Sequence, residues 1–298
     1  MEVTAASAHR KRLGLVLAIT AAVFVAEVVG GLLSGSLALL ADAGHMLTDA
    51  TGLVLALIAA SLATRAATTR RTFGWQRAEV LAALVNALLL VGIGVWVLIK
   101  AIDRLRSPGE IETGLMLIIA IMGALANTAG LLILRRGQAT SLNVRGAYLE
   151  VLGDLLGSVA VVVAAILIRL TGWYRFDAIA SLLIFALIVP RAWSLLSEVV
   201  DVLLEATPLG VDLVAVRDHI RGVAGVVDLH DLHAWTITSG VPVLSAHVVV
   251  DEACISQGRS GEVLDRLAEC LGGHFDVEHC TFQLEPVGHQ DHEARHHA

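Results

Sequence analysis

Long apolar runs dominate the first two thirds of the chain. Val80–Ile99 and Thr113–Leu134 contain no charged residue, and each run is long enough to cross about 30 Å of hydrocarbon as an α-helix. Four further runs are largely apolar and carry only one or two charged or histidine side chains each: Leu13–Leu33, Gly44–Leu62, Gly146–Ile168 and Ala178–Val200. The first run is too long for a cleaved signal peptide, and more membrane sequence follows it at once. The pattern therefore predicts six transmembrane helices.

The pattern changes after Pro208, where shorter elements of mixed polarity begin. Two stretches have the spacing of amphipathic helices and three have the alternation of β-strands. In chain order they are Leu209–Gly222, Val226–Thr238, Val241–Glu252, Gly258–Leu271 and Cys280–Pro286. Ser239-Gly240 between the first two strands is typical of a hairpin turn. The order α-β-β-α-β predicts a small α+β domain whose helices cover one face of a sheet.

Basic residues are concentrated at the amino terminus and in the second and fourth connections between the spans. Together these segments hold Arg10, Lys11, Arg12, Arg65, Arg70, Arg71, Arg77, Arg135, Arg136 and Arg145. Because basic loops remain in the cytoplasm, both termini are predicted to be cytoplasmic, in agreement with an even number of spans. The inner (plasma) membrane of a bacterium is the expected location, although an organelle membrane would show the same charge bias.

The fold class is therefore an α-helical membrane bundle of six transmembrane helices followed by a small cytoplasmic α+β domain. We expect a cytoplasmic amino terminus (residues 1–12), a membrane domain (13–205), a cytoplasmic domain (206–287) and a disordered tail that contains histidines (288–298). In the reducing cytoplasm Cys254, Cys270 and Cys280 should be free thiols or metal ligands rather than disulfides.

The composition also indicates that the chain has two parts, an apolar one suited to lipid and an acidic one suited to water. The chain is 56% hydrophobic and 16% charged, with a mean hydropathy of +0.75. Residues 206–298 hold 5 Lys or Arg and 14 Asp or Glu, a net charge of −9, and ten of the 12 histidines. This acidic balance argues against nucleic-acid binding, which needs a basic surface, and suits the attraction of divalent cations.

Two spans carry titratable pairs at helical spacing. His45 and Asp49 are four residues apart on one predicted helix, and Glu150 and Asp154 are four apart on another. Each pair therefore lies on one helix face. A charged side chain in the bilayer centre costs at least ~2.5–3.5 kcal/mol, so these groups must face protein, water or an ion. One imidazole and three carboxylates make four ligands, the number that tetrahedral Zn²⁺ takes.

Other polar residues in the spans have simpler interpretations. Glu27, Asn86 and Asn127 are expected to make hydrogen bonds between helices. Asp42 lies near the predicted membrane surface, where it would either cap the second helix or line an entry path. A packing histidine remains the alternative for His45 taken alone.

Three segments resemble the cation diffusion facilitators, a family of proton-coupled exporters of zinc and related metals. The second-span segment is Leu39-Leu40-Ala41-Asp42-Ala43-Gly44-His45-Met46-Leu47-Thr48-Asp49-Ala50. The third-span segment is Arg77-Ala78-Glu79-Val80-Leu81-Ala82-Ala83-Leu84-Val85-Asn86, and the fifth-span segment is Val151-Leu152-Gly153-Asp154-Leu155-Leu156-Gly157-Ser158. The resemblance implies a homodimer whose cytoplasmic domain is similar to copper chaperones. It also implies transport of divalent metal ions in exchange for protons.

One position departs from the zinc-type pattern, which carries a His-x-x-x-Asp pair in the fifth span as well. Here the first position of that pair is Glu150, which makes the site harder and more negative. Zn²⁺ is still the expected substrate, but Mn²⁺ and Fe²⁺ tolerate harder sites better, and Cd²⁺ and Co²⁺ also remain open. Alternatively, Glu150 binds metal weakly and serves mainly as a proton acceptor.

The cytoplasmic domain offers candidates for a second, regulatory Zn²⁺ site. Alternation places His247 and Glu285 on the sheet face away from the apolar side, together with His279. His230 matches a family position that often binds metal, whereas His233 would lie on the opposite face of a regular strand. A solvated residue is the alternative for each histidine alone. Cys280 is expected in the core.

Two other classes of function, an enzyme and a metal sensor, agree less well with the sequence. An intramembrane metalloprotease would carry His-Glu-x-x-His on a helix, and the sequence has no such run, so an enzyme is not expected. A membrane-tethered metal sensor would explain the cytoplasmic histidines but not ligands within the spans.

Overall fold

The computed structural model describes residues 5–135, 142–275 and 279–292. It divides the chain into two compact units, Met1–Leu55 with Val85–Leu195 and Ala56–Leu84 with Leu196–Ala298. Each unit is described by itself below.

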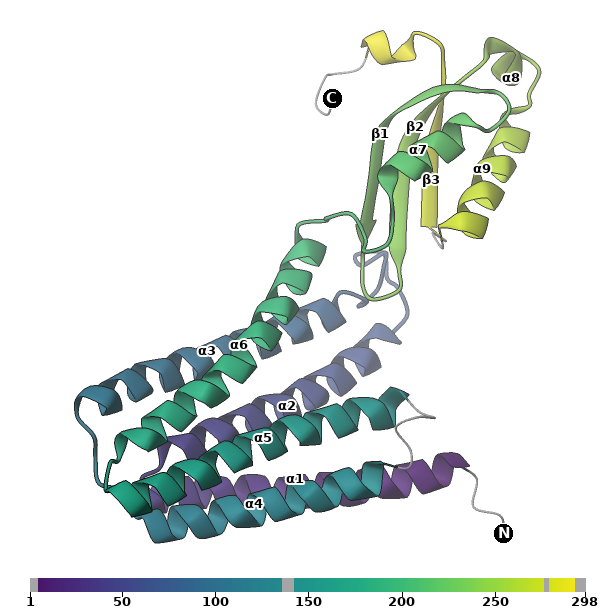
Figure 1. Cartoon of the computed structure of the whole chain (residues 1–298). Helices are drawn as coiled ribbons and strands as arrows, with labels where there is room; N and C mark the ends of the chain where they lie inside the picture. Colours follow the sequence, from purple (N-terminus) through teal and green to yellow (C-terminus); the bar gives the residue numbers. More distant parts are fainter. Residues whose placement is uncertain (1–4, 136–141, 276–278, 293–298) are drawn as a thin grey trace. The chain divides into compact units, whose positions relative to one another are not determined.

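Six helices in the described part of the chain are long and apolar enough to span a membrane. They are α1 (Ala5–Ser34), α2 (Leu37–Ala63), α3 (Ala78–Arg106), α4 (Thr113–Leu134), α5 (Leu142–Thr171) and α6 (Arg175–Leu203) (Figure 1). The predicted six-helix membrane bundle is confirmed. Many of the outward apolar side chains are exposed, among them Leu17, Leu125 and Leu183, as expected where lipid rather than water surrounds the helices.

The predicted and observed ends of the helices agree best where a polar residue caps the helix. Helix α4 has the predicted bounds, and the side chain of Glu112 caps it by accepting a hydrogen bond from the backbone N–H of Leu115. Helix α2 begins at Leu37 rather than at Gly44, and α3 continues to Arg106, so Lys100 and Arg104 lie in a helix instead of a connection. Hydropathy detects the lipid-facing run, whereas hydrogen bonding continues the helix into polar residues.

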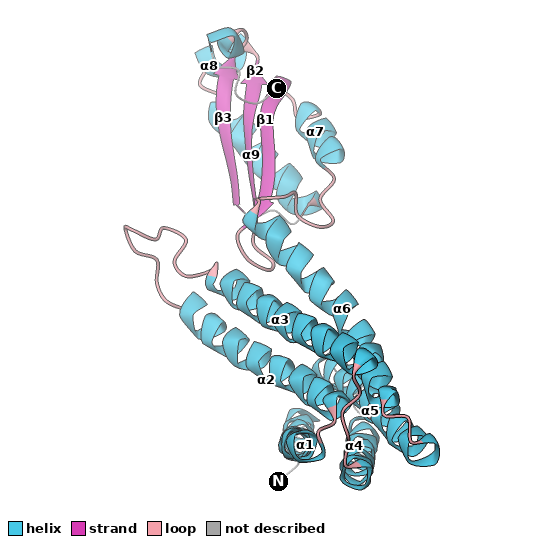
Figure 2. Ribbon diagram, turned by 90° about the vertical axis from the view of Figure 1, so that its left-hand side faces the viewer, coloured by secondary structure: helices cyan, strands magenta, loops and turns pink. Residues whose placement is uncertain are grey.

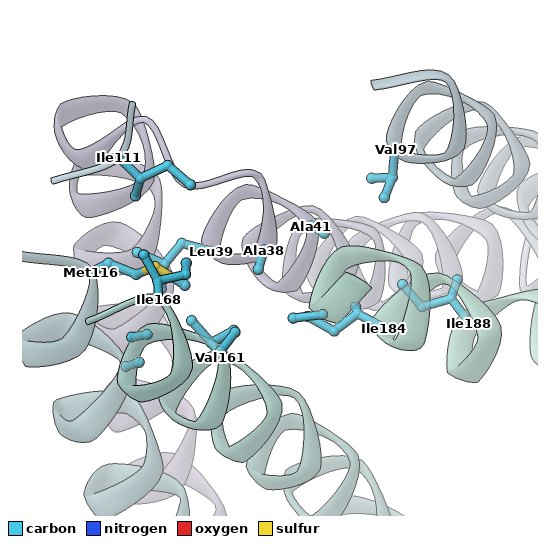
Figure 3. Packing of buried hydrophobic residues seen from close by; sticks show 14 of the residues in the cluster. Ala38, Leu39, Ala41, Val97, Ile111, Met116, Val161, Ile168, Ile184 and Ile188 are labelled. Atoms are coloured by element: carbon cyan, nitrogen blue, oxygen red, sulfur yellow. The ribbon is translucent and has the colours of Figure 1, made fainter. Parts of the chain in front are cut away.

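The core of the first unit is built from small and branched apolar side chains of several helices. Figure 3 shows Leu39 of α2, Val161 of α5 and Ile184 of α6 in one buried cluster, together with Met116 of α4. Residues such as Ala38 and Ala41 keep the side-chain layer thin. In lipid the hydrophobic effect does not bring helices together, so close van der Waals packing of this kind stabilises the bundle instead.

One carboxylate ties three helices together at the end where α2 begins. Asp177 of α6 is completely buried and accepts hydrogen bonds from Ser36 Oγ (2.6 Å) and from the backbone N–H of Leu37 (2.9 Å). Arg104 of α3 lies 2.8 Å from the same carboxylate and donates to the carbonyl of Gly35. Asp177 thus caps α2 from another helix and neutralises Arg104.

The second unit contains a three-stranded sheet in the order β1 (Val226–Thr236), β2 (Pro242–Val250) and β3 (His279–Pro286). Strands β1 and β2 are antiparallel and joined by the predicted turn, with Gly240 at a φ of 76°, whereas β2 and β3 are parallel. The helices are α7 (Leu213–Arg221), the short α8 (Glu252–Ser256) and α9 (Ser260–His274), followed by a 3₁₀ turn at His289–His292. The structure confirms the α+β domain and adds α8 to the predicted order.

Both longer helices of this unit pack on one face of the sheet. Val216 of α7 and Leu267 of α9 share a buried cluster with Leu244 and Val248 of β2. Cys280 packs against the same cluster, as expected. Figure 2 looks onto the other face of the sheet, with α9 behind the strands. The polar positions of β2 and β3 therefore lie on the face that these helices leave uncovered.

A β-bulge interrupts β1 between His230 and His233. His230 is opposite His247, but His233 rather than the next alternate residue is opposite Ser245. Asp231 in the bulge has a φ of 45°, a left-handed conformation that Asp tolerates better than most residues. The prediction that His233 faces away from His230 is wrong, because the extra residue returns it to the same face.

The Asp177 tie should be a main determinant of stability in the first unit. Asp177→Ala removes a cap and leaves Arg104 without its carboxylate, so we expect about 3 kcal/mol of destabilisation. Thermal unfolding of the purified protein in detergent measures it. Asp103→Asn, at an exposed position of α3, is the matched control and should unfold like the wild type. Equal stability of both variants would contradict the assignment.

Candidate metal centres

Three of the predicted membrane ligands lie together. Ligand atoms of His45 and Asp49 on α2 and of Asp154 on α5 are all within 4.8 Å of one another. His45 Nε2 is 3.5 Å from Asp49 Oδ2, and Asp154 is only 3% exposed. The helical spacing explains the first pair, and the packing of the first unit adds the third residue.

These ligand atoms have unused hydrogen-bonding capacity. His45 Nδ1, Asp49 Oδ2 and Asp154 Oδ1 are buried and make no hydrogen bond to a described residue. Ligand atoms around a tetrahedral zinc ion stand roughly 3.3 Å apart, because Zn–N and Zn–O bonds are about 2 Å long. Because the ligand atoms are at most 4.8 Å apart, an approach of about 1.5 Å or less would suit a divalent ion.

Glu150, the fourth predicted ligand, is not part of this group. Its side chain is 40% exposed, and Oε1 lies 4.0 Å from Arg191 Nη2 of α6. The other nitrogen of the same guanidinium, Nη1, is 3.7 Å from Asp49 Oδ2. Arg191 thus lies beside both carboxylates. Arg191 lies inside the sixth apolar run, where an arginine is by itself a sign of a functional role.

A second polar cluster lies beside the candidate ligands. Asn127 Nδ2 of α4 donates to Ser158 Oγ of α5 (3.3 Å), which confirms the predicted hydrogen bond between helices. Ser158 Oγ in turn lies 3.5 Å from Asp42 Oδ2, and Asp42 is buried. Asp42 is therefore neither the cap of α2, which Asp177 provides, nor part of an exposed entry path.

Two glycines allow this cluster to pack so closely. A Cβ at Gly157 would clash with the carboxylate of Asp42, and one at Gly123 would lie 2.9 Å from Glu27 Oε1. The prediction for Glu27 is wrong, because neither of its carboxylate oxygens makes a hydrogen bond within the described part of the chain. Asn86 contacts α2 at Gly52 instead, where an added Cβ would lie 2.6 Å from Nδ2.

The second unit brings two histidines and a glutamate together on the uncovered face of the sheet. Ligand atoms of His230, His247 and Glu285 lie within 4.8 Å of one another. Glu285 Oε2 is 3.1 Å from His230 Nε2, and Oε1 is 2.7 Å from His247 Nδ1. Gln283 Nε2 donates to Oε1 (2.8 Å), and Glu285 is only 1% exposed. Two imidazoles and a carboxylate are a donor set that zinc accepts.

The remaining cytoplasmic candidates lie outside this group. His279 is exposed and its ring meets Phe73 edge-on, with centroids 6.3 Å apart. His233 is exposed but shares the sheet face of His230, for the reason given above. Of the tail histidines, His296 and His297 lie outside the described residues.

The cysteines do not add soft ligands to the site. The structure contains all three as free thiols. Cys254 is buried in the core beneath the sheet, and the side chain of Asp251 beside it raises the pKa of its thiol. Burial likewise raises the pKa of Cys280. Since the thiolate is the form that binds metal, both residues behave as core side chains.

Comparison with known proteins identifies both parts of the chain. A family model described as the cation efflux transmembrane domain matches residues 13–204. A second model, described as the cytoplasmic domain of cation efflux proteins, matches residues 208–287.

Individual relatives are similar over most of their length. The metal cation efflux system protein CzcD of Cupriavidus metallidurans is 46% identical over 277 residues, which are 93% of this chain and 87% of that protein. The zinc transporter ZitB of Escherichia coli is 43% identical over 279 residues, 93% of this chain and 88% of the relative. The cadmium, cobalt and zinc/H(+)-K(+) antiporter of Bacillus subtilis is 39% identical over 267 residues, 89% of this chain and 85% of the relative.

These relatives are transporters of metal cations rather than enzymes, and they align with this chain through the spans and the cytoplasmic domain alike. A multi-pass membrane protein with this order of domains is therefore a metal efflux transporter in its general function. The chain belongs to the cation diffusion facilitator family.

Proposed function

We propose that the protein is an antiporter that exports divalent cations from the cytoplasm in exchange for protons, with Zn²⁺ as the principal substrate. The observation that carries this proposal is the group of His45, Asp49 and Asp154, whose ligand atoms lie within 4.8 Å of one another. One buried polar atom of each residue makes no hydrogen bond within the described part of the chain. Glu150, one helical turn from Asp154, is the proposed fourth ligand. It would reach the ion by leaving Arg191.

Ligand chemistry supports coupling to protons. A metal ion binds neutral imidazole and ionised carboxylates, so loading releases protons and protonation expels the metal. A ring nitrogen of histidine holds either a metal ion or a proton, so His45 can take part in this exchange. Protons that enter from outside would displace the cation toward the outside, and the Bacillus subtilis relative is itself named an antiporter of metal ions against H(+) and K(+).

The same proposal includes the membrane location, the pairing of two chains and a regulatory metal site. Both termini would be cytoplasmic in the inner membrane of a bacterium, as the basic connections indicate. The cytoplasmic domain would pair two copies of the chain, as the family resemblance implies. It would also hold a regulatory Zn²⁺ through His230, His247 and Glu285, which present two nitrogens and a carboxylate to one point.

Asp49→Asn and Asp154→Asn test the membrane site. Each change removes one anionic ligand while keeping side-chain size, so zinc flux into proteoliposomes with a proton gradient should fall to the level of protein-free vesicles. Asp103→Asn, an exposed residue away from the group, serves as the control and should transport normally. A folded Asp154→Asn protein that retains more than half of the wild-type flux would exclude the site.

Glu150→His tests the role of the fourth position. A nitrogen ligand is softer than a carboxylate, so the ratio of zinc to manganese flux should rise several-fold if position 150 touches the ion. Parallel measurements of both metals in one proteoliposome preparation give this ratio directly. An unchanged ratio would mean that Glu150 is not a ligand.

His230→Ala and His247→Ala test the cytoplasmic site. Each variant should bind one zinc ion fewer per chain than the wild type in equilibrium dialysis of the full-length protein, because the group loses a ligand. His279→Ala is the comparison, since His279 lies outside the group, and it should bind as the wild type does. Loss of a zinc ion in His279→Ala but not in His247→Ala would reverse the assignment.

A further inference from the structure

Arg191 is the only lysine or arginine within the six apolar runs of the sequence. A guanidinium is always protonated in proteins and costs several kcal/mol in a span unless it has partners. Its partners here are Asp49 and Glu150, at 3.7 and 4.0 Å. Both belong to the set of four ligands proposed above. The permanent positive charge of Arg191 on α6 therefore lies beside the proposed metal site.

The charges of the site balance only when Arg191 is included. Three ionised carboxylates, a neutral imidazole and one guanidinium leave two negative charges, which a divalent cation cancels. Without Arg191 the loaded site would retain one negative charge in a medium of low dielectric constant, where an unbalanced charge is costly.

The geometry also makes Arg191 a competitor of the metal. Its Nη1 lies 3.7 Å from Asp49 Oδ2 and its Nη2 lies 4.0 Å from Glu150 Oε1, so the guanidinium occupies part of the space beside both carboxylates. The Arg191 side chain is 55% exposed, so it has space to withdraw when an ion takes the carboxylates. Asp154 Oδ1 makes no hydrogen bond within the described residues and stays available for the first encounter.

We propose that Arg191 is a tethered countercation of the transport site. It neutralises Asp49 and Glu150 while no metal is bound, and it matches the charge of the loaded site to a divalent ion. It also weakens metal binding enough for release. This inference rests on the proposed function, because it assigns a role to Arg191 only if the four ligands bind the transported ion. A purely structural ion pair, which only holds α6 against α2 and α5, is the alternative.

Zinc titration of the purified full-length protein separates these roles. A His230→Ala/His247→Ala background removes the cytoplasmic group, so that the membrane group is the one remaining metal group among the described residues. In this background Arg191→Gln should bind zinc about tenfold more tightly or better, since a positive charge a few ångströms from the ion is removed. It should also export zinc more slowly, because release becomes limiting. Arg191→Lys keeps the charge and should stay within a few-fold of the parent.

A double variant tests the charge balance itself. Glu150→Gln removes one negative charge and should weaken zinc binding, whereas Glu150→Gln/Arg191→Gln restores two net negative charges and should recover at least part of the loss. Arg169→Gln, an exposed arginine of α5, is the control and should bind zinc like the parent. Arg191→Met, which keeps an apolar side-chain stem, replaces Arg191→Gln if that protein does not fold.

Weaker or unchanged zinc binding by the charge-removing variants would overturn the proposal and favour the structural ion pair. The proposed function fails differently. If Asp154→Asn in the same background leaves zinc binding intact, the membrane group is not the zinc site at all, whatever Arg191 does. If Asp154→Asn abolishes binding but Arg191→Gln does not tighten it, only the role of Arg191 is rejected.

Discussion

Charge in a hydrocarbon environment is the constraint on which the membrane part of this protein depends. A side chain such as Asp177 is tolerated there because every oxygen has a donor, from Ser36, Leu37 and Arg104. His45, Asp49 and Asp154 are different, because several of their buried atoms have no hydrogen-bond donor or acceptor within the described residues. Together with their closeness to one another, this feature separates the proposed metal ligands from a structural carboxylate such as Asp177.

Hydropathy and residue spacing predict the spans and the proposed metal ligands, respectively. Apolar runs identify the helices, and the four-residue spacing of His45 and Asp49 places them on one face of α2. That Asp154 joins them depends on helix packing, which spacing in one helix cannot show. The role of Asp177 was missed, because a cap supplied by a helix 140 residues away leaves no local pattern. The spacing of Glu150 and Asp154 predicts Glu150 as a fourth ligand, but spacing does not reveal that the guanidinium of Arg191 lies beside it.

The cytoplasmic domain shows where strand alternation is sufficient and where it fails. It places His247 and Glu285 on one face correctly, because β2 and β3 pair without interruption. It fails for His233, because it assumes a regular strand. The buried residues Leu229 and Ala234 are five positions apart and would face opposite sides of such a strand, yet both lie opposite residues of the helix-covered face. The bulge at Asp231 reconciles them.

The tie at Asp177 has a mechanical consequence. It joins α2, α3 and α6 at the end where α2 begins, whereas Asp49 lies 13 residues along α2 from Ser36 and Arg191 lies 14 residues along α6 from Asp177. At 1.5 Å per residue each helix is a lever arm of about 20 Å, so a tilt of about 10° at this pivot displaces the ligand by about 3 Å. Such a displacement exceeds a metal–ligand bond length. A small rotation about one buried carboxylate is thus enough to assemble or dismantle a coordination sphere.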